Sequence, residues 1–70
     1  MVDKEIQLKI IEQRIAGIEV DLTAIKFDLR VATSIDDKEW IKRCEDSATR
    51  STKMKDEFEK ILTELQVVSE

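Results

Sequence analysis

The strongest constraint on this 70-residue chain is a row of apolar residues that recur at alternating spacings of three and four. This spacing is typical of an amphipathic helix that packs in the manner of a coiled coil. It predicts a helix from about residue 3, with Asp3 as its N-cap, to about residue 32. We call the row the first seam, and its members are Leu8, Ile11, Ile15, Ile18, Leu22, Ile25, Leu29 and Ala32.

A second apolar row follows the same spacing on the opposite side of the same predicted helix. A helix with one partner needs only one apolar stripe, so two stripes predict partners on two sides. The row contains Gly17. Because glycine destabilises a helix interior, its presence on an apolar row predicts that another backbone approaches closely there. Gln13 is its one polar interruption. We call this row the second seam, and its members are Ile6, Ile10, Gly17, Val20, Ala24, Phe27 and Val31.

The apolar pattern restarts one residue out of register after residue 32. The new row is Trp40, Cys44, Ser47, Ser51, Met54, Phe58, Ile61, Leu65 and Val68. Ser34 and Asp37 have the spacing of a capping box, so we predict a turn at about residues 33–36 and a second helix over about 36–67. Neither Gly nor Pro enforces this turn, so a straightened hairpin exchanged between chains stays an alternative.

A short connection between two long helices predicts that they pack as antiparallel neighbours. The expected fold is all-α: one domain over residues 1–70, an antiparallel two-helix hairpin of coiled-coil type. Folding the chain at the turn pairs Ile25 with Cys44 and Ile15 with Met54. A core of this size rarely contributes more than about 3–5 kcal/mol, so we expect two hairpins to form a homodimeric four-helix bundle. The second seam would supply its interface, with Trp40 as a further candidate.

The composition excludes most chemistry. The chain has no histidine and one cysteine, Cys44, so neither a zinc site nor a histidine-activated nucleophile can be built. No phosphate-binding loop is present. We therefore predict no enzyme activity, no catalytic residue, no metal and no cofactor. Opposite charges lie four residues apart at Glu5–Lys9, Glu39–Arg43, Asp46–Arg50 and Asp56–Lys60, which is typical of a solvated helix face.

Charge and hydropathy limit the partners. A net charge of −4 disfavours nucleic acid and anionic lipid, and apolar runs no longer than two residues predict no membrane span. The first residues lack a basic segment followed by an apolar run, so we expect a cytoplasmic protein. Free Cys44 fits a reducing compartment and is expected as a small buried apolar residue. Trp40 either caps the core near the turn or anchors a partner.

The expected architecture resembles small antiparallel hairpins that dimerise into four-helix bundles, such as plasmid copy-control RNA-binding bundles. It also resembles the hairpin chaperones that clasp secretion-needle subunits. Likeness of fold does not carry function across. Our first hypothesis is a homodimeric protein–protein interaction or assembly module with an unidentified protein partner. The alternatives are a small acidic inhibitor or anti-defence protein of a mobile element that occludes a host enzyme, and a chaperone-like subunit of a hetero-oligomeric helical bundle.

Overall fold

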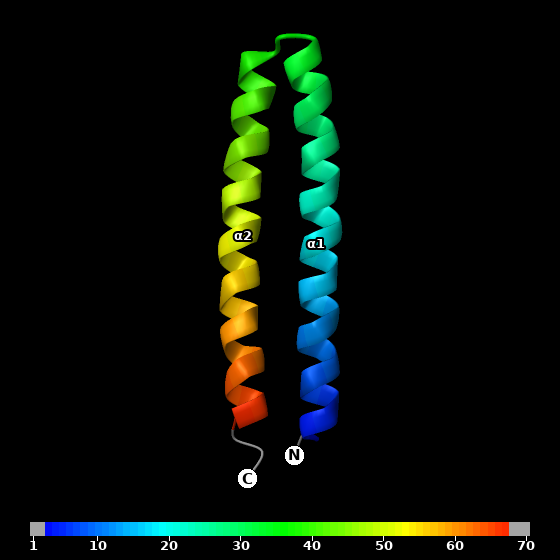
Figure 1. The fold of residues 1–70 in the computed structure, drawn as a ribbon, viewed down its shortest axis with the longest axis vertical. Coiled ribbons are helices and arrows are strands. Elements are labelled where there is room, and N and C mark those ends of the chain that lie inside the picture. Colours follow the sequence, from blue (N-terminus) through cyan, green and yellow to red (C-terminus); the bar gives the residue numbers. More distant parts are fainter. Residues whose placement is uncertain (1–2, 68–70) are drawn as a thin grey trace.

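The chain forms a helical hairpin. The computed structural model describes residues 3–67, which hold two helices, α1 (Lys4–Ser34) and α2 (Lys38–Val67). The helices run antiparallel and side by side, so the start of α1 and the end of α2 lie at the same end of the molecule (Figure 1). The rod measures 53 × 16 × 14 Å along its principal axes. The predicted all-α hairpin is confirmed.

The start of α1 is capped as the sequence predicted. Asp3 has an extended backbone, and its side chain accepts a hydrogen bond from the Glu5 backbone N–H at 3.3 Å. The Asp3 carbonyl accepts the Gln7 N–H at 3.1 Å, which is the first hydrogen bond of the helix. The carboxylates of Asp3 and Glu5 also lie near the positive end of the helix dipole, where negative charge stabilises the helix.

The end of α1 is a Schellman motif built without glycine. Asp36 adopts a left-handed backbone with φ of 57°. The Asp37 N–H donates to the Ala32 carbonyl at 2.9 Å, and the Asp36 N–H donates to the Thr33 carbonyl at 3.1 Å. These two bonds satisfy carbonyls that a helix end leaves free, and aspartate tolerates the left-handed region better than most residues. The helix therefore continues to Ser34, two residues beyond its predicted end.

The N-cap of α2 is Asp37, so the predicted capping box of Ser34 with Asp37 is wrong. The Asp37 carboxylate accepts the Trp40 backbone N–H at 3.1 Å. Its carbonyl accepts the Ile41 N–H at 2.9 Å. Ser34 instead belongs to the last turn of α1. Asp37 thus completes the Schellman motif of one helix and caps the next, and the turn occupies residues 35–37 rather than 33–36.

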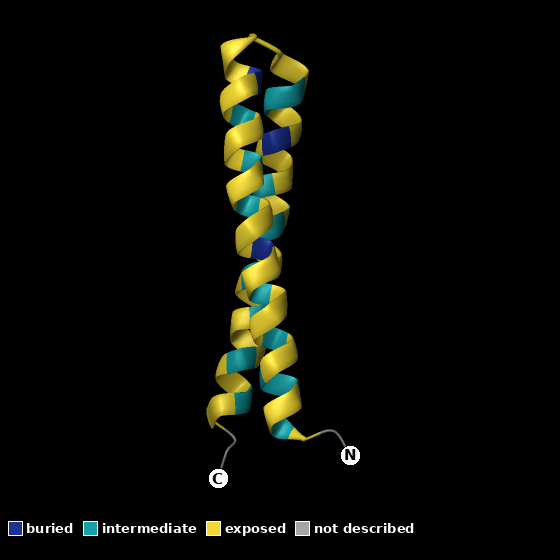
Figure 2. Cartoon of the chain, turned by 90° about the vertical axis from the view of Figure 1, so that its right-hand side faces the viewer, coloured by how far each residue is buried: buried dark blue, intermediate teal, exposed yellow. Residues whose placement is uncertain are grey.

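The first seam faces α2, as predicted. Each of its eight members is buried or half-buried, with Ile18 5% exposed and Ala32 fully buried. Figure 2 shows such residues recurring along both helices, while the rest of each surface is exposed. Burial of these large leucine and isoleucine side chains is the main favourable contribution to the packing of α1 on α2.

The inward row of α2 differs from the predicted row. Ser47, Met54 and Ile61 were expected to face α1, but all three are exposed. Their neighbours one residue later, Ala48, Lys55 and Leu62, are half-buried instead. The predicted Val68 lies outside the described residues. The inward row is Ile41, Cys44, Ala48, Ser51, Lys55, Phe58, Leu62 and Leu65.

The predicted and observed inward rows of α2 differ because they share the residues at the centre of the inward face and diverge only beside it. Both contain Cys44, Ser51, Phe58 and Leu65, which lie inside in either case. One residue along a helix is a rotation of about 100°, so the remaining positions lie on opposite sides of that centre. Small Ala48 lets α1 approach closely. Lys55 can lie along the seam because a long stem packs on apolar atoms while its charged end reaches outward.

Candidate interaction surface

The second seam forms an exposed apolar strip along α1. Its large members are Val20, Phe27, Ile6, Val31 and Ile10, which are 68%, 63%, 52%, 50% and 45% exposed. Gly17 and Ala24 are exposed as well. Because the first seam faces α2 and the second lies about half a turn away, most of this strip points away from the rest of the hairpin, and Ile10 and Gly17 border hollows shared with α2. The structure therefore brings all seven α1 residues of the predicted interface onto one surface.

Trp40, the eighth predicted interface residue, lies apart from this strip. It belongs to the first turn of α2, where its backbone N–H bonds to the Asp37 cap. The residue is half-buried, and it lines a shallow surface hollow together with Asp37, Glu39 and Arg43. The structure thus places Trp40 beside the turn, half-buried in the first turn of α2.

Gly17 is not required by the hairpin itself. A methyl group added at its Cα would meet no atom within 4 Å, apart from its own helix backbone and its chain neighbours. Glycine weakens a helix interior by about 1 kcal/mol relative to alanine. The surface beside Gly17 is hollowed, and Arg14, Asp21 and Met54 are among the residues that line the hollow. Nothing within the hairpin therefore explains why this position carries no side chain.

A second apolar area lies towards the open end, and the sequence analysis missed it. Met54 and Ile61 are 45% and 42% exposed, and both line a hollow with Phe58. Ile61 also lines a hollow with Ile10 and Leu65, so the area reaches across to one end of the second seam. The sequence analysis assigned Met54 and Ile61 to the core. Once Lys55 takes the inward position, these two side chains are left at the edge.

Within residues 3–67, one ion pair crosses between the helices. Lys55 Nζ lies 3.2 Å from a carboxylate oxygen of Glu19, and the Lys55 side chain is only 27% exposed. Glu19 is 57% exposed, so the pair lies at the border of the core. No local pattern predicts this pair, because its members are 36 positions apart and each is typical of a solvated charge. The contact joins one position of α1 to one position of α2, and so favours a single register.

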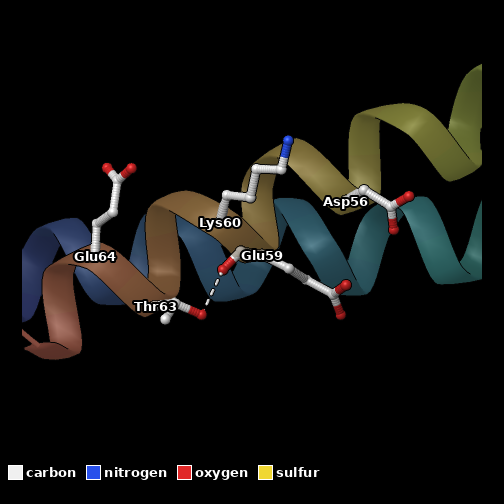
Figure 3. A pocket seen from close by; sticks show the side chains of 5 residues that line it. All are labelled: Asp56, Glu59, Lys60, Thr63 and Glu64. Atoms are coloured by element: carbon white, nitrogen blue, oxygen red, sulfur yellow. Dashed lines mark hydrogen bonds between the residues drawn. The ribbon is translucent and has the colours of Figure 1, made fainter.

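The outer face of α2 carries charged side chains that are exposed to solvent. Figure 3 shows Asp56, Glu59, Lys60, Thr63 and Glu64 around a surface hollow, where the Glu64 carboxylate lies apart from those of Asp56 and Glu59. The Thr63 hydroxyl donates to the Glu59 carbonyl at 3.0 Å. Among residues 3–67, no cluster of three or more acidic or cysteine side chains is arranged to hold a metal ion. This face has the character of a solvated helix surface.

Of the four charge pairs singled out in the sequence, only Glu39–Arg43 forms an ion pair within the part of the chain that the structure describes. Arg43 lies 2.9 Å from Glu39, as the four-residue spacing predicted. Lys60 pairs with Glu57 at 3.0 Å rather than with the predicted partner Asp56. Both observed pairs have side chains at least 70% exposed. Exposed pairs of this kind contribute little to stability, so they support the helix without forming a site.

Cys44 is buried, as predicted, and is 5% exposed. Burial raises the pKa of its thiol, and the negative charges of Asp28 and Glu45 raise the pKa further. A raised pKa keeps the sulfur protonated near neutral pH, and a protonated thiol is a poor nucleophile. Cys44 therefore behaves as a small core residue that lets α1 and α2 approach closely.

Comparison with known proteins adds no relative to these observations. No protein-family model, no curated protein and no solved structure matches the chain significantly. Over the described part of the chain, neither helix combines the length and the apolar character needed to cross a membrane. The second seam is thus the most distinctive surface of the described residues, and the case for function rests on it.

Proposed function

We propose that this chain is a non-enzymatic helical assembly module that works as a homodimer through the second seam of α1. The observation that carries the proposal is the exposure of five large apolar side chains, by 45–68%, on the side of α1 that points away from α2. Soluble monomers rarely expose a continuous apolar surface of this kind. Covering it with a second copy removes it from water and adds to a hydrophobic core that is small in one hairpin.

The proposed dimer has four helices. Because the second seam lies on the far side of α1 from α2, the hairpins meet back to back, with the two α1 helices in the middle. Each α1 is then packed on both sides, and each α2 lies at the outside with its charged face in water. This arrangement is a layered form of the four-helix bundle that the sequence predicted.

The proposal includes a protein partner and a reducing, cytoplasmic setting. Buried, free Cys44 suits such a compartment. The net charge of −4 disfavours nucleic acid and anionic lipid as partners. Exposed carboxylates on the outer face of α2 and a buried thiol whose pKa is raised give no support to catalysis or to a bound cofactor. The dimer would act by presenting helical surfaces, such as the area around Met54 and Ile61, to another protein.

Sedimentation equilibrium of the full chain tests the proposal. The wild type is expected to be a dimer at micromolar concentration. Val20→Glu places a charge in the centre of the seam, so it should give a monomeric hairpin. Thr49→Glu adds the same charge on the exposed side of α2 and is the matched control, expected to remain dimeric.

Three outcomes would contradict the proposal. A wild type that is folded and monomeric at high concentration would indicate that the second seam binds a different chain, as in the inhibitor hypothesis. A wild type that is poorly folded alone would indicate a subunit of a hetero-oligomeric bundle. A Val20→Glu variant that stays dimeric would show that copies associate through another surface.

A further inference from the structure

We infer that the two copies pair α1 against α1 in antiparallel orientation, with the two-fold axis between Ile18 and Glu19. This inference rests on the proposed homodimer and adds its geometry. The axis is set by the seam itself, because in this register every member of the second seam faces another position of the same row. The strip between residues 6 and 31 is then covered along its whole length, about 37 Å at 1.5 Å per residue.

The facing layers match in size. Gly17 faces the partner's Val20, the most exposed large apolar residue of the strip. Ile10 faces the partner's Phe27. Because an added Cβ at Gly17 would meet nothing in the hairpin, the space above this glycine is free for the side chain of the partner's Val20. The dimer thus gives glycine a packing role that the single hairpin does not.

The remaining layers also favour the antiparallel orientation. Gln13 faces the partner's Ala24. Because alanine is small, the Gln13 amide has room to reach water. A parallel pair would place Gln13 against the same residue of the partner subunit and Gly17 against the second glycine. Those layers would bury two amides together and leave a void, and both are unfavourable.

Charges beside the seam select the same orientation. Arg14 and Asp21 are exposed and line the surface next to Gly17. In the antiparallel register Arg14 lies beside the partner's Asp21, and the symmetry of the dimer forms this pair twice. In a parallel pair Arg14 would instead lie beside the partner's Lys9, which repels it. Opposite charges at the flanks of a helix pair set its orientation.

One flank opposes this arrangement weakly. Lys9 approaches the partner's Arg30 near each end of the interface, and all four side chains are at the rim. Both residues are exposed in the hairpin, so their charges stay solvated and screened by salt. The central Arg14–Asp21 pairs lie closer to the axis, where the helices are held together on both sides. Their attraction is therefore the stronger effect on orientation.

Charge exchange at Arg14 and Asp21 tests the inference by sedimentation equilibrium. Arg14→Asp and Asp21→Arg should each weaken the dimer by about tenfold, because each creates two like-charge pairs. The double variant re-forms the pairs with reversed sign and should return to within about threefold of the wild-type dissociation constant. In a parallel dimer Arg14→Asp would tighten association by facing Lys9, and that result would overturn the orientation.

A spin label at exposed residue 33 measures the orientation directly. Antiparallel helices centred between Ile18 and Glu19 place the two labels on the order of 40 Å apart, at 1.5 Å of rise per residue. A parallel dimer places them within about 20 Å, as neighbours across one helix pair. A short distance overturns the antiparallel geometry but leaves the homodimer standing. Absence of any intermolecular distance overturns the homodimer, and the inference falls with it.

Gly17→Ala separates the hairpin from the dimer. Alanine should stabilise the α1 helix, because it removes a helix-weakening glycine from a site with free space. The same methyl group would occupy the position of the partner's Val20 and should weaken the dimer by about tenfold. Association that is unchanged or tighter would overturn the close crossing at Gly17.

Discussion

The two helices of this hairpin differ in how many of their sides need a partner. α1 carries apolar residues on two opposite faces, of which α2 covers one and leaves the other exposed. α2 is apolar on one face and charged on the other, as surface helices of globular proteins usually are. Similar length and a shared core therefore do not make the helices equivalent. α2 can form the outer layer of an assembly, whereas α1 is suited to a central position.

The helices also contribute differently to the core they share. The first seam of α1 supplies leucine and isoleucine over most of its length, while the middle of α2 supplies Ala48, Ser51 and the stem of Lys55. Bulky residues on one side meet small or polar residues on the other, which lets the backbones approach. The cost of losing a side chain should therefore be greater on the inner face of α1 than at any other place.

Side-chain truncations on the two faces of α1 should show the largest difference in the free energy of unfolding. Ile18 is 5% exposed, so Ile18→Ala removes core packing and should lower the free energy of unfolding by about 2–5 kcal/mol. Val20→Ala, two residues away, should change it by less than about 0.5 kcal/mol when the hairpin is monomeric. Urea denaturation at low protein concentration measures both. Equal effects would show that α2 does not cover the first seam.

Substitution of the two neighbouring aspartates in the turn should change the stability of the hairpin in opposite directions. Asp37→Ala removes the acceptor of the Trp40 N–H and should destabilise the hairpin by about 1 kcal/mol. Asp36→Gly relieves a side chain held at φ of 57° and should stabilise it by about 0.5–1 kcal/mol. Thermal unfolding of the two variants checks the signs. Destabilisation by Asp36→Gly would contradict the left-handed turn.

The ion pair between the helices should have a larger coupling energy than the ion pair within α2. Double-mutant cycles with Glu19→Gln and Lys55→Met are expected to give a coupling energy of about 0.5–1 kcal/mol, because Lys55 is only 27% exposed. The control cycle uses Glu39 and Arg43, whose side chains are 78% and 75% exposed, and should give less than about 0.5 kcal/mol. A Glu19–Lys55 coupling no larger than that of the control would mean that Lys55 is solvated rather than packed in the seam.

The smallest effect concerns the thiol of Cys44 and depends on pH. The folded state raises the pKa of Cys44, so the unfolded chain loses this proton first as the pH increases. Stability should be unchanged by this group below about pH 8.5, the usual thiol pKa, and should decline at higher pH. Urea denaturation at several pH values measures the decline, with Cys44→Ala as the control that lacks it. A native thiol that reacts with a disulfide reagent as fast as the unfolded chain would contradict its burial.

Local periodicity accounts for what the sequence predicted well. The spacing of the first and second seams fixes which residues share a face of α1, because 3.6 residues per turn is a property of the backbone. The burial of Ile18 and Cys44 and the exposure of Val20 follow from that spacing once a hairpin forms. The cap at Asp3 was also predictable, since its side chain bonds to an N–H only two residues away.

The tertiary structure decided the features that depend on a partner helix. In α2 the centre formed by Cys44 and Phe58 is fixed by the sequence, but either Met54 or Lys55 can complete the inward row. The sequence pattern favours apolar Met54 as the core residue. In the structure, Glu19 of α1 pairs with the Lys55 ammonium instead, and Met54 lies at the edge of the core. Periodicity determines faces within one helix, whereas the choice between adjacent rows depends on distances between two helices that no local pattern contains.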